Sequence, residues 1–430
     1  MRLPMICLDV HFANFLGRHQ QCFSKPQYQY FVTILLGLVL CQSGCTLSGV
    51  LRQVESGVSV SGVSRFLAQS PWATQGLSET WQKHFGQALV SAVEAEHARQ
   101  RAKRRKQRGR PRQTVVTGYL IGDDTVMQKL RGRKMAGLGK HYSSTHEKPV
   151  TGHCMVQALY VLLGRRCPLE PQMYRQQVVC EQEGVPFRSK VEIMRDIVLN
   201  FAPVAHTQTH VLLDSWYTAK SIWQAARQRG FLITSGLRSN RQVRIDDTGN
   251  ERGWRWQRLD GYASQLTEQA FTPLVWPNSE RTVYVHVVST RIKKLYCCQF
   301  ICVREQLDGP TRFWASSDLA ADPQTLLAHI AQRWDVEQLF ADVKELLGLD
   351  HYQLMSATAI QRFWTLVMLA YLFLDEERCR LQEQQQRPVT IGEACRHVQR
   401  THWSHLLDWL HHAFTERQLC PADLHATILA

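Results

Sequence analysis

Acidic residues are in short supply in this chain of 430 residues. It carries 37 aspartates and glutamates against 51 lysines and arginines, which gives a formal net charge of +14. Such a deficit points to a polyanionic partner, and nucleic acid is the commonest one. The alternative is that the positive charge serves solubility alone. The hydrophobic fraction of 44% excludes a disordered chain, and the length suits two or three domains.

Cysteines at metal-binding or redox spacing are also lacking. The 13 cysteines are scattered, and no pair has the C-x2-C spacing of a zinc ribbon or a dithiol redox site. We therefore expect reduced, mostly buried cysteines in a cytoplasmic protein. One apolar run, residues 31–41, has about half the length that a membrane-spanning helix requires, so it predicts a buried helix and no membrane partner.

A dense basic segment, residues 97–113, reads HARQRAKRRKQRGRPRQ and contains no acid. We call this segment the basic arm. Because so many like charges repel one another, it is expected to be an extended linker. It either follows the phosphates of DNA or is a solvated linker that touches nothing, and the basic character of the whole chain favours DNA. The residues expected to contact DNA there are Arg101, Lys103, Arg104, Arg105 and Lys106.

The hydrophobic pattern differs on the two sides of the basic arm. Residues 1–96 read as helical, which is typical of a DNA-binding head but also of any small helical bundle. After the arm, strand-like runs alternate with helical spacing, which predicts an α/β core. The strands are expected at 115–121, 152–163, 209–213 and 231–234, and the helices at 191–199 and 219–227.

Residues 237–316 interrupt this core with strand-like runs that have no helix between them, and we expect a β-rich insertion. The full division is a helical N-terminal DNA-binding region, the basic arm, a core in two parts around the insertion, and C-terminal helices. The corresponding residues are 1–96, 97–113, 114–236, 237–316, 317–385 and 386–430. Long helices are expected at 324–347 and 357–380.

Two strand-like runs end in aspartate, LIGD at Asp123 and VLLD at Asp214. In open α/β sheets the ligand site lies outside the carboxyl ends of the strands. Two aspartates from neighbouring strands could share divalent metal ions, which prefer hard oxygen ligands. Either aspartate alone is better explained as a helix cap or a turn former.

The helical segment 331–347 adds a third acid. Its apolar residues fall on one stripe, the expected core face: Val336, Leu339, Val343 and Leu346. At 100° per residue, Arg333, Glu337 and Lys344 share the neighbouring face. One carboxylate between two cations suits a site for metal and phosphate, although a surface helix with paired charges gives the same pattern.

This helix resembles the signature helix of DDE transposases from bacterial insertion sequences, which reads Y-x2-R-x3-E-x6-K. Arg333, Glu337 and Lys344 stand at the matching spacing, whereas the tyrosine position holds Ile330, which has no hydrogen-bond donor. Residues 123–125 (DDT) are similar to the first acidic motif of the family, and residues 213–217 (LDSWY) to the second. The segment with Arg65-Phe66 and Pro71-Trp72 looks most like the insertion sequence 701 family.

The resemblance implies a ribonuclease-H-like core in which Asp123, Asp214 and Glu337 are catalytic and hold two Mg²⁺ or Mn²⁺ ions. It implies that Arg333 and Lys344 bind DNA phosphates. It also implies double-stranded DNA partners, namely the terminal inverted repeats and a target, and a dimer on that DNA. Adjacent strand residues face opposite ways, so only one of Asp123 and Asp124 can point into the site, and the DxT pattern favours Asp123.

The sequence thus predicts a nucleoid-associated transposase that cleaves DNA and transfers strands. Two alternatives remain open: a metal-dependent nuclease of the same fold, and an inactive DNA-binding repressor derived from a transposase. Tryptophans in a β-rich insertion usually belong to its core. The alternative is that one of them stacks on a flipped-out base, and the candidates are Trp254 and Trp256, because they stand among polar and basic residues.

Overall fold

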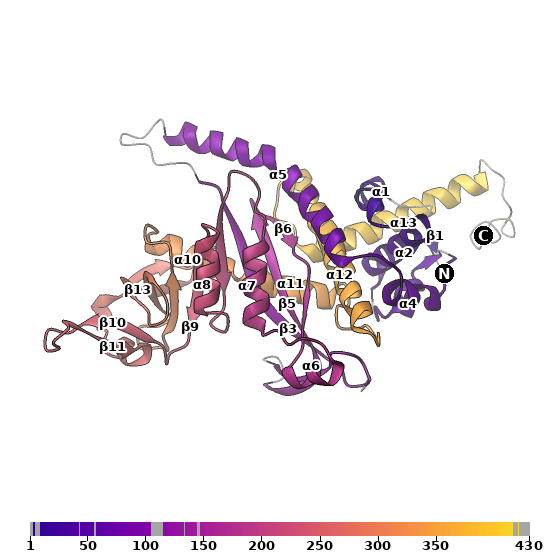
Figure 1. Cartoon of the computed structure of the whole chain (residues 1–430). Coiled ribbons are helices and arrows are strands. Elements are labelled where there is room, and N and C mark those ends of the chain that lie inside the picture. The colour runs from indigo at the N-terminus through magenta and orange to yellow at the C-terminus, as the bar shows by residue number, and fades with distance from the viewer. Residues whose placement is uncertain are drawn as a thin grey trace.

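The fold was analysed in a computed structural model of the chain, which describes residues 3–4, 9–42, 44–55, 57–104, 115–132, 134–143, 147–415 and 420 (Figure 1). A large mixed sheet forms its centre. The strands of the first part of the core are β3 (Thr117–Gln128), β4 (Gly139–Ser143), β5 (Lys148–Leu162), β6 (Arg165–Pro168), β7 (Gln172–Tyr174), β8 (Gln208–Leu213) and β9 (Leu232–Leu237).

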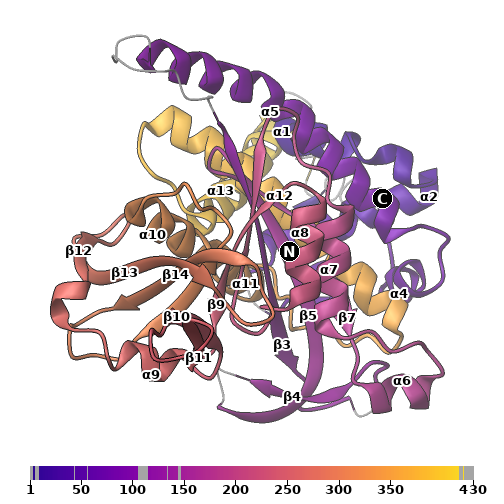
Figure 2. The same ribbon diagram turned by 60° about the vertical axis from the view of Figure 1, so that its left-hand side comes forward.

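The strands of the insertion extend this sheet instead of forming a separate one. They are β12 (Thr272–Val275), β13 (Thr282–Arg291), β14 (Cys297–Arg304) and β15 (Arg312–Ser316). The strand order is β12-β13-β14-β15-β9-β8-β3-β5-β4, with β6 and β7 paired to β5 (Figure 2). A separate hairpin of β10 (Gln242–Asp246) and β11 (Trp254–Arg258) precedes α9 (Leu259–Ala263) and a short 3-10 helix, η3 (Glu268–Ala270).

The centre of the sheet has the ribonuclease-H-like arrangement that the sequence led us to expect. Strands β3, β8 and β9 are parallel, and β5 runs antiparallel on the other side of β3. The run from Val211 to Leu213 is buried on both faces, as expected of a central parallel strand. Long connections between parallel strands carry the helices, so the fold class predicted from the alternating pattern is confirmed.

Strand β3 is longer than predicted. The sequence suggested that it ends at Asp123, but it continues to Gln128, because β5 pairs with it from Gly118 to Gln128. Asp123 therefore lies inside a strand whose last part is held on one side by β5 alone. The parallel partner β8 stops at the pair Gly122–Leu213, which leaves Asp123 beside the end of β8.

Helices cover both faces of the sheet (Figures 1 and 2). On one face lie α7 (Lys190–Asn200) and α8 (Lys220–Gln228), and a side chain at Gly122 would collide with Met194 of α7. On the other face lie α10 (Pro323–Gln332), α11 (Trp334–Glu345) and α12 (Ala357–Gln385), and Lys344 of α11 contacts Thr125. A short helix, α6 (Gln177–Glu183), follows β7. Adjacent residues of β3 thus face different helices.

The helix expected over 324–347 is interrupted. It divides at Arg333, which follows α10 and precedes α11. The Arg333 backbone N–H bonds to the Ala331 carbonyl, which is a tighter turn than in an α-helix. The predicted apolar stripe is otherwise confirmed, because Val336, Leu339 and Val343 are fully buried. The break places Arg333 at the junction of two helices, where its side chain can reach back over the sheet.

The N-terminal region is helical, and it lies against the end of the core that is remote from the insertion (Figure 1). Its elements are α1 (Val10–Gly17), η2 (Gln20–Cys22), α2 (Lys25–Leu40), α3 (Leu47–Leu51), α4 (Val60–Ala68) and α5 (Thr74–Arg104), with a two-residue pairing of β1 (Leu3–Pro4) and β2 (Val54–Glu55). The apolar run 31–41 is buried within and directly after α2, as predicted. The Arg362 guanidinium of α12 donates to the carbonyls of Leu67 and Trp72 and so ties this region to the core.

The helix α12 is the one helix among the described residues that is long and apolar enough to cross a membrane. The sequence analysis expected a helix at 357–380 but did not treat it as a candidate membrane span. Of its most apolar stretch, 83% is buried inside the protein, between the sheet, α2, α4 and α13 (Ile391–Thr415). This is the pattern of a core helix in a folded domain.

The basic arm begins later than predicted. Residues 97–104 were expected to be extended, but they form the last two turns of α5, because this stretch is rich in Ala, Arg, Lys and Gln, which are good helix formers. Arg101 and Lys103 are exposed on this helix, and Arg104 ends it. Arg105 and Lys106, with the rest of the arm to residue 113, lie outside the described residues.

Candidate active site

Asp123 and Asp214 stand side by side on neighbouring strands. The last paired residues of β3 and β8 are Gly122 and Leu213, and the two aspartates come directly after this pair. As expected, two neighbouring strands carry aspartates at the same level of the sheet. Asp214 follows the end of its strand, whereas Asp123 lies on a strand that continues.

A tight turn fixes the orientation of Asp214. Its Oδ1 accepts hydrogen bonds from the backbone N–H groups of Trp216 and Tyr217, at 2.9 and 3.2 Å. The Thr218 hydroxyl donates to the Asp214 carbonyl oxygen at 3.3 Å and also to the carbonyl of Gly236 on β9. A Cβ atom at Gly236 would lie 2.9 Å from the Ser215 nitrogen, so glycine permits the close approach of this turn to β9.

Asp123 lies in a buried and strongly negative environment. Burial, followed by the Asp214 and Asp124 carboxylates, raises the pKa of Asp123 to about 7, although the Asp124 N–H and the Arg333 guanidinium act in the opposite direction. Burial is also the main cause of a raised pKa at Asp214. Such a site favours a bound cation, because a cation relieves the repulsion between the carboxylates.

Asp124 faces the opposite side of β3 and is already engaged there. Its carboxylate accepts from the Lys190 ammonium at 2.6 Å and from the Tyr217 hydroxyl at 2.7 Å, and the Cys154 thiol lies 3.4 Å away. Of the two adjacent acids, Asp123 is therefore the one that faces Arg333 and the helix with Glu337. The choice of Asp123 as the catalytic residue stays a prediction, now with a structural rationale.

Arg333 connects Asp123 with Glu337. Its Nη2 donates to Glu337 Oε1 at 2.6 Å, and its Nη1 lies 3.6 Å from Asp123 Oδ2. The guanidinium thus lies between a carboxylate of the sheet and a carboxylate of α11. The shared face of Arg333 and Glu337 that the helical spacing predicted is present, and it is turned toward the two aspartates.

Lys344 of α11 contacts β3 at Thr125, two residues after Asp123 and on the same face of the strand. Its ammonium donates to the Thr125 hydroxyl at 2.7 Å and to the Val126 carbonyl at 3.4 Å. Burial lowers the pKa of this lysine, and Asp350 opposes that effect. In the structure Lys344 therefore joins α11 to β3, and its predicted contact with a DNA phosphate stays a prediction.

Ile330, which stands where the resemblance would place a tyrosine, is a core residue. It is 3% exposed and packs in a cluster with Val283, Val285, Ile301 and other apolar residues of β13, β14 and α10. An aliphatic side chain satisfies this apolar environment, whereas a tyrosine there would need a partner for its hydroxyl. The helix α10 is thus anchored to the strands of the insertion by the residue that departs from the signature.

The donor set fits divalent metal ions in its chemistry. Carboxylate oxygens are the ligands that Mg²⁺ and Mn²⁺ prefer, and Asp123, Asp214 and Glu337 supply them. Among the described residues, no three His, Cys, Asp or Glu side chains are close enough to share one ion, and Arg333 stands between Asp123 and Glu337. Its guanidinium shows that a cation is stable at the place toward which these two carboxylates point.

The tryptophans of the insertion differ in their surroundings. Trp254 and Trp256 lie on the hairpin strand β11, far from α11 in Figure 1, and their rings meet edge to face at 5.5 Å. Both are half-buried, and the Arg244 guanidinium lies 4.9 Å from the Trp254 ring centre. Trp276 and Trp314 pack against the apolar cluster around Ile330. The stacking role predicted for Trp254 or Trp256 stays untested.

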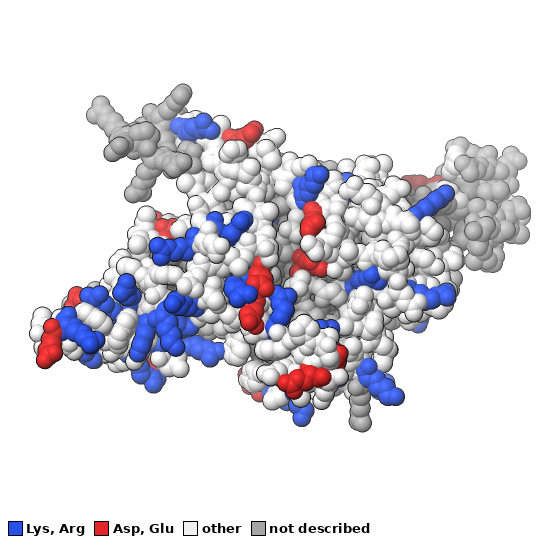
Figure 3. Space-filling model, in the orientation of Figure 1, with Lys and Arg blue, Asp and Glu red and all other residues white. Residues whose placement is uncertain are grey.

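Positive charge gathers on the surface of the insertion (Figure 3). Its exposed cations include Arg238, Arg244, Arg252, Arg255, Lys293 and Lys294. The sequence analysis assigned the DNA-binding charge to the basic arm and to α11 and did not single out this surface. The signal that could have revealed it is the repeated arginine in residues 238–258, in which strand alternation directs several cations outward.

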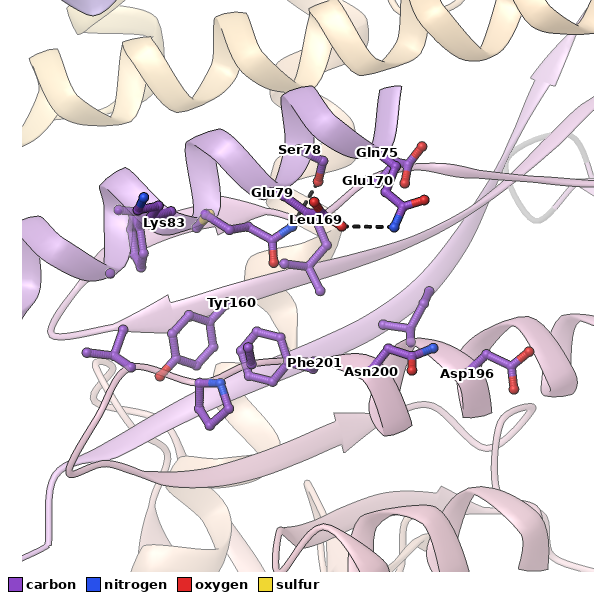
Figure 4. Close-up of a pocket in the computed structure, with 18 of the residues that line it drawn as sticks. Gln75, Ser78, Glu79, Lys83, Tyr160, Leu169, Glu170, Asp196, Asn200 and Phe201 are labelled. Carbon is purple, nitrogen blue, oxygen red and sulfur yellow. Dashed lines mark hydrogen bonds between the residues drawn. The ribbon is translucent and has the colours of Figure 1, made fainter. Parts of the chain in front are cut away.

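A cavity of about 850 Å³ lies elsewhere, between α5, α7 and the edge of the sheet (Figure 4). Tyr160 and Phe201 form its apolar side, and Glu79, Glu170 and Asp196 add negative charge. None of the three predicted catalytic acids lines it. The acids instead lie at the end of β8, beside β3 and α11.

Comparison with known proteins gives one family match. A family model described as "DDE superfamily endonuclease" matches residues 19–283, which is more than half of the chain and includes Asp123 and Asp214 but not Glu337. No curated protein matches the chain. A solved structure that matches is a cryo-EM structure of a piggyBac transposase synaptic complex with hairpin DNA, with 10% identity, a TM-score of 0.42, and coverage of 98% of this chain and 81% of that chain.

Proposed function

Because this chain belongs to the DDE superfamily of endonucleases, we propose that it is a DNA transposase that cuts the ends of an insertion sequence and joins them to target DNA. The observation that carries the proposal is the placement of the three acids. Asp123 and Asp214 come directly after the last paired residues of the adjacent strands β3 and β8, and Arg333 links Asp123 to Glu337 on α11. These residues belong to three separate parts of the sequence.

Divalent metal ions are the cofactors that this superfamily uses. We propose that Asp123, Asp214 and Glu337 hold two Mg²⁺ or Mn²⁺ ions. When bound, these ions activate a water or a 3′-hydroxyl as nucleophile and stabilise the departing oxygen. For its own part, the chain supplies the hard oxygen donors, fixes Asp214 through two backbone N–H groups, and keeps Asp123 shielded from bulk water.

The cations near the acids have a separate task. In this proposal, Arg333 and Lys344 contact the phosphates that flank the scissile bond, Arg333 as a planar fork and Lys344 as a point charge. The basic arm and the helical N-terminal region hold the terminal repeats. Two ends must be brought together, so the working form on DNA is at least a dimer, and the expected location is with the nucleoid.

The acids weigh against the inactive repressor, because a protein without chemistry has no need for aspartates at the same level of two adjacent strands and an arginine that links one of them to Glu337. A nuclease that cuts without joining shares the whole site. Joining therefore distinguishes the proposal from its nearest alternative.

The test uses a duplex oligonucleotide that carries the candidate element ends, read from the DNA that flanks the gene, together with a supercoiled target plasmid. With Mg²⁺, the proposal predicts cleavage at the end of the element and covalent joining of the labelled end to the plasmid. Cleavage without joined product identifies a nuclease. Specific binding without cleavage in either Mg²⁺ or Mn²⁺ identifies a repressor.

A further inference from the structure

Trp216 is an exposed aromatic residue beside a predicted catalytic acid. Its side chain is 54% exposed, whereas the next residue, Tyr217, is fully buried. The turn that fixes Asp214 also fixes Trp216, since the Trp216 N–H is one of the two donors to Asp214 Oδ1. A large apolar ring is thus held in solvent two residues from the carboxylate, at an edge of the protein that DNA can reach.

Two cations flank this ring. The Arg238 guanidinium, at the end of β9, lies 4.8 Å from the ring centre, and the Lys190 ammonium, at the start of α7, lies 5.9 Å from it. Arg238 is exposed, and Lys190 also bonds Asp124. Both cations lie over the ring, so a base that stacks on it must take the place of a cation, and the displaced cation can then meet a phosphate. Proteins bind unpaired nucleotides with this combination of an aromatic ring and nearby cations.

The backbone around Trp216 is held on several sides. The Thr218 hydroxyl bonds the carbonyls of Asp214 and Gly236, and the Arg241 guanidinium bonds the Thr218 carbonyl. The backbone of Trp216 therefore keeps a fixed relation to Asp214, and Arg238 and Lys190 contact its ring. A base that rests on a ring held in this way places its own phosphate at a fixed position as well, which is what positioning a reactive bond requires.

We propose that Trp216 stacks on the base of a nucleotide adjoining the scissile phosphate, and that Arg238 contacts the backbone phosphate of that strand. The inference rests on the proposed function and deepens it by naming a nucleotide contact. A base inside a duplex is already stacked on its neighbours, so this contact requires DNA that is unpaired or distorted at the cut. Trp254 and Trp256 offer less free surface, because each is half-buried and contacts the other.

The test compares Trp216→Ala, Trp216→Phe and Trp403→Ala in Mg²⁺-dependent cleavage of the end oligonucleotide. Trp403 is the matched control, since it is 44% exposed on α13, away from the acids. Trp216→Ala should lower kcat/KM by about 10- to 100-fold, which is the effect of losing one stacked base. Trp216→Phe should recover most of this loss because it keeps an aromatic face. Trp403→Ala should cleave like the wild type.

A second substrate separates stacking from a structural role. The base next to the cut is removed one position at a time to give abasic oligonucleotides. Where the missing base is the one that stacks, the wild type and Trp216→Ala should cleave at equal rates. Arg238→Gln should reduce the slope of log affinity against log salt by about 0.9, the value for one bound phosphate.

Several outcomes would overturn the inference. If the wild type cleaves but Trp216→Ala matches it on every substrate, Trp216 does not stack. If Trp216→Phe loses as much activity as Trp216→Ala, and no abasic position makes the variants equal, the tryptophan only supports the Asp214 turn. If the wild type itself does not cleave the ends, the proposed function fails and the inference fails with it.

Discussion

The raised pKa of Asp123 predicts that metal binding depends on pH near neutrality. Burial and the Asp214 and Asp124 carboxylates raise this pKa to about 7 in the absence of metal. A metal ion must then displace a proton from Asp123 at any pH below that value. We therefore expect Mg²⁺ or Mn²⁺ to bind about tenfold more tightly at pH 8 than at pH 6, because the deprotonated fraction rises about tenfold over this range.

The same shift has a consequence for stability, and its sign follows from linkage. The folded protein holds the Asp123 proton up to about pH 7, whereas the unfolded chain releases it near pH 4. The metal-free protein therefore loses roughly 4 kcal/mol of unfolding free energy from this group as the pH rises from about 4 to 7. Bound metal offsets this loss, so the metal-induced rise in Tm should increase with pH across that range.

Titration calorimetry with Mn²⁺, repeated at several pH values and in buffers of different ionisation enthalpy, measures the affinity and the proton release. Thermal unfolding with and without Mn²⁺ at the same pH values measures the rise in Tm. The wild type should release close to one proton per site at pH 6 and little at pH 8. In Asp123→Asn, the residual binding should lose most of its pH dependence. Asp335→Asn is the matched control, because Asp335 pairs with Arg166 at 3.3 Å, on the side of α11 away from the site.

An affinity that stays constant between pH 6 and pH 8 would refute the reasoning. So would an Asp123→Asn variant with the pH dependence of the wild type, because the titrating group would then be elsewhere.

Three further predictions concern DNA. Neutralising the five predicted DNA-binding residues of the arm together should reduce the slope of log affinity against log salt by about 0.9 for each phosphate that they bind. An unchanged slope would mean that the arm is only a linker. Lys344→Met should slow cleavage. If its slope of log affinity against log salt falls by about 0.9, Lys344 binds a phosphate; if the slope is unchanged, Lys344 serves only to bond Thr125. If Trp254 or Trp256 stacks on a flipped base, its alanine variant should lose cleavage on intact ends and regain part of it on abasic ends; a lowered Tm without such recovery would show a packing role.

The central fold could be predicted because its pattern is local. The apolar, β-branched runs at β3 and β8 indicate buried strands, and the stripe of Val336, Leu339 and Val343 indicates a helix face. The strand length was harder to predict. Strand β3 continues past Asp123 because β5 pairs with it, and this pairing joins residues that are far apart in the sequence.

The break at Arg333 and the extent of α5 show two other limits. Nothing in the residues around Arg333 is a helix breaker, and the division of α10 from α11 accompanies contacts of Arg333 with a carboxylate of the sheet. At the end of α5, the repulsion among basic residues suggested an extended chain, but helix propensity prevailed as far as Arg104. Tertiary contacts and propensity outweighed the simpler rules in these two places.

At the candidate site, the strand ends, the helical spacing and the motif resemblance predicted the three acids. The motif favoured Asp123 over Asp124, but the sequence could not give the geometric reason, because that depends on which helix lies on each face of β3. Lys190 was missed altogether, since a lysine at the start of a helix 66 residues from Asp124 carries no signal of its own. Trp216 stood in a recognised motif, but the motif does not show that its ring is exposed to solvent, which only the structure reveals.

The most direct test of the central claim is Mg²⁺-dependent cleavage of end DNA by the single variants Asp123→Ala, Asp214→Ala, Glu337→Ala and Asp124→Ala, with DNA binding measured in parallel. The account predicts that the first three lose cleavage by several orders of magnitude while they still bind the end DNA. Normal cleavage by Asp214→Ala or Glu337→Ala, or a complete loss of cleavage confined to Asp124→Ala, would contradict the proposed site.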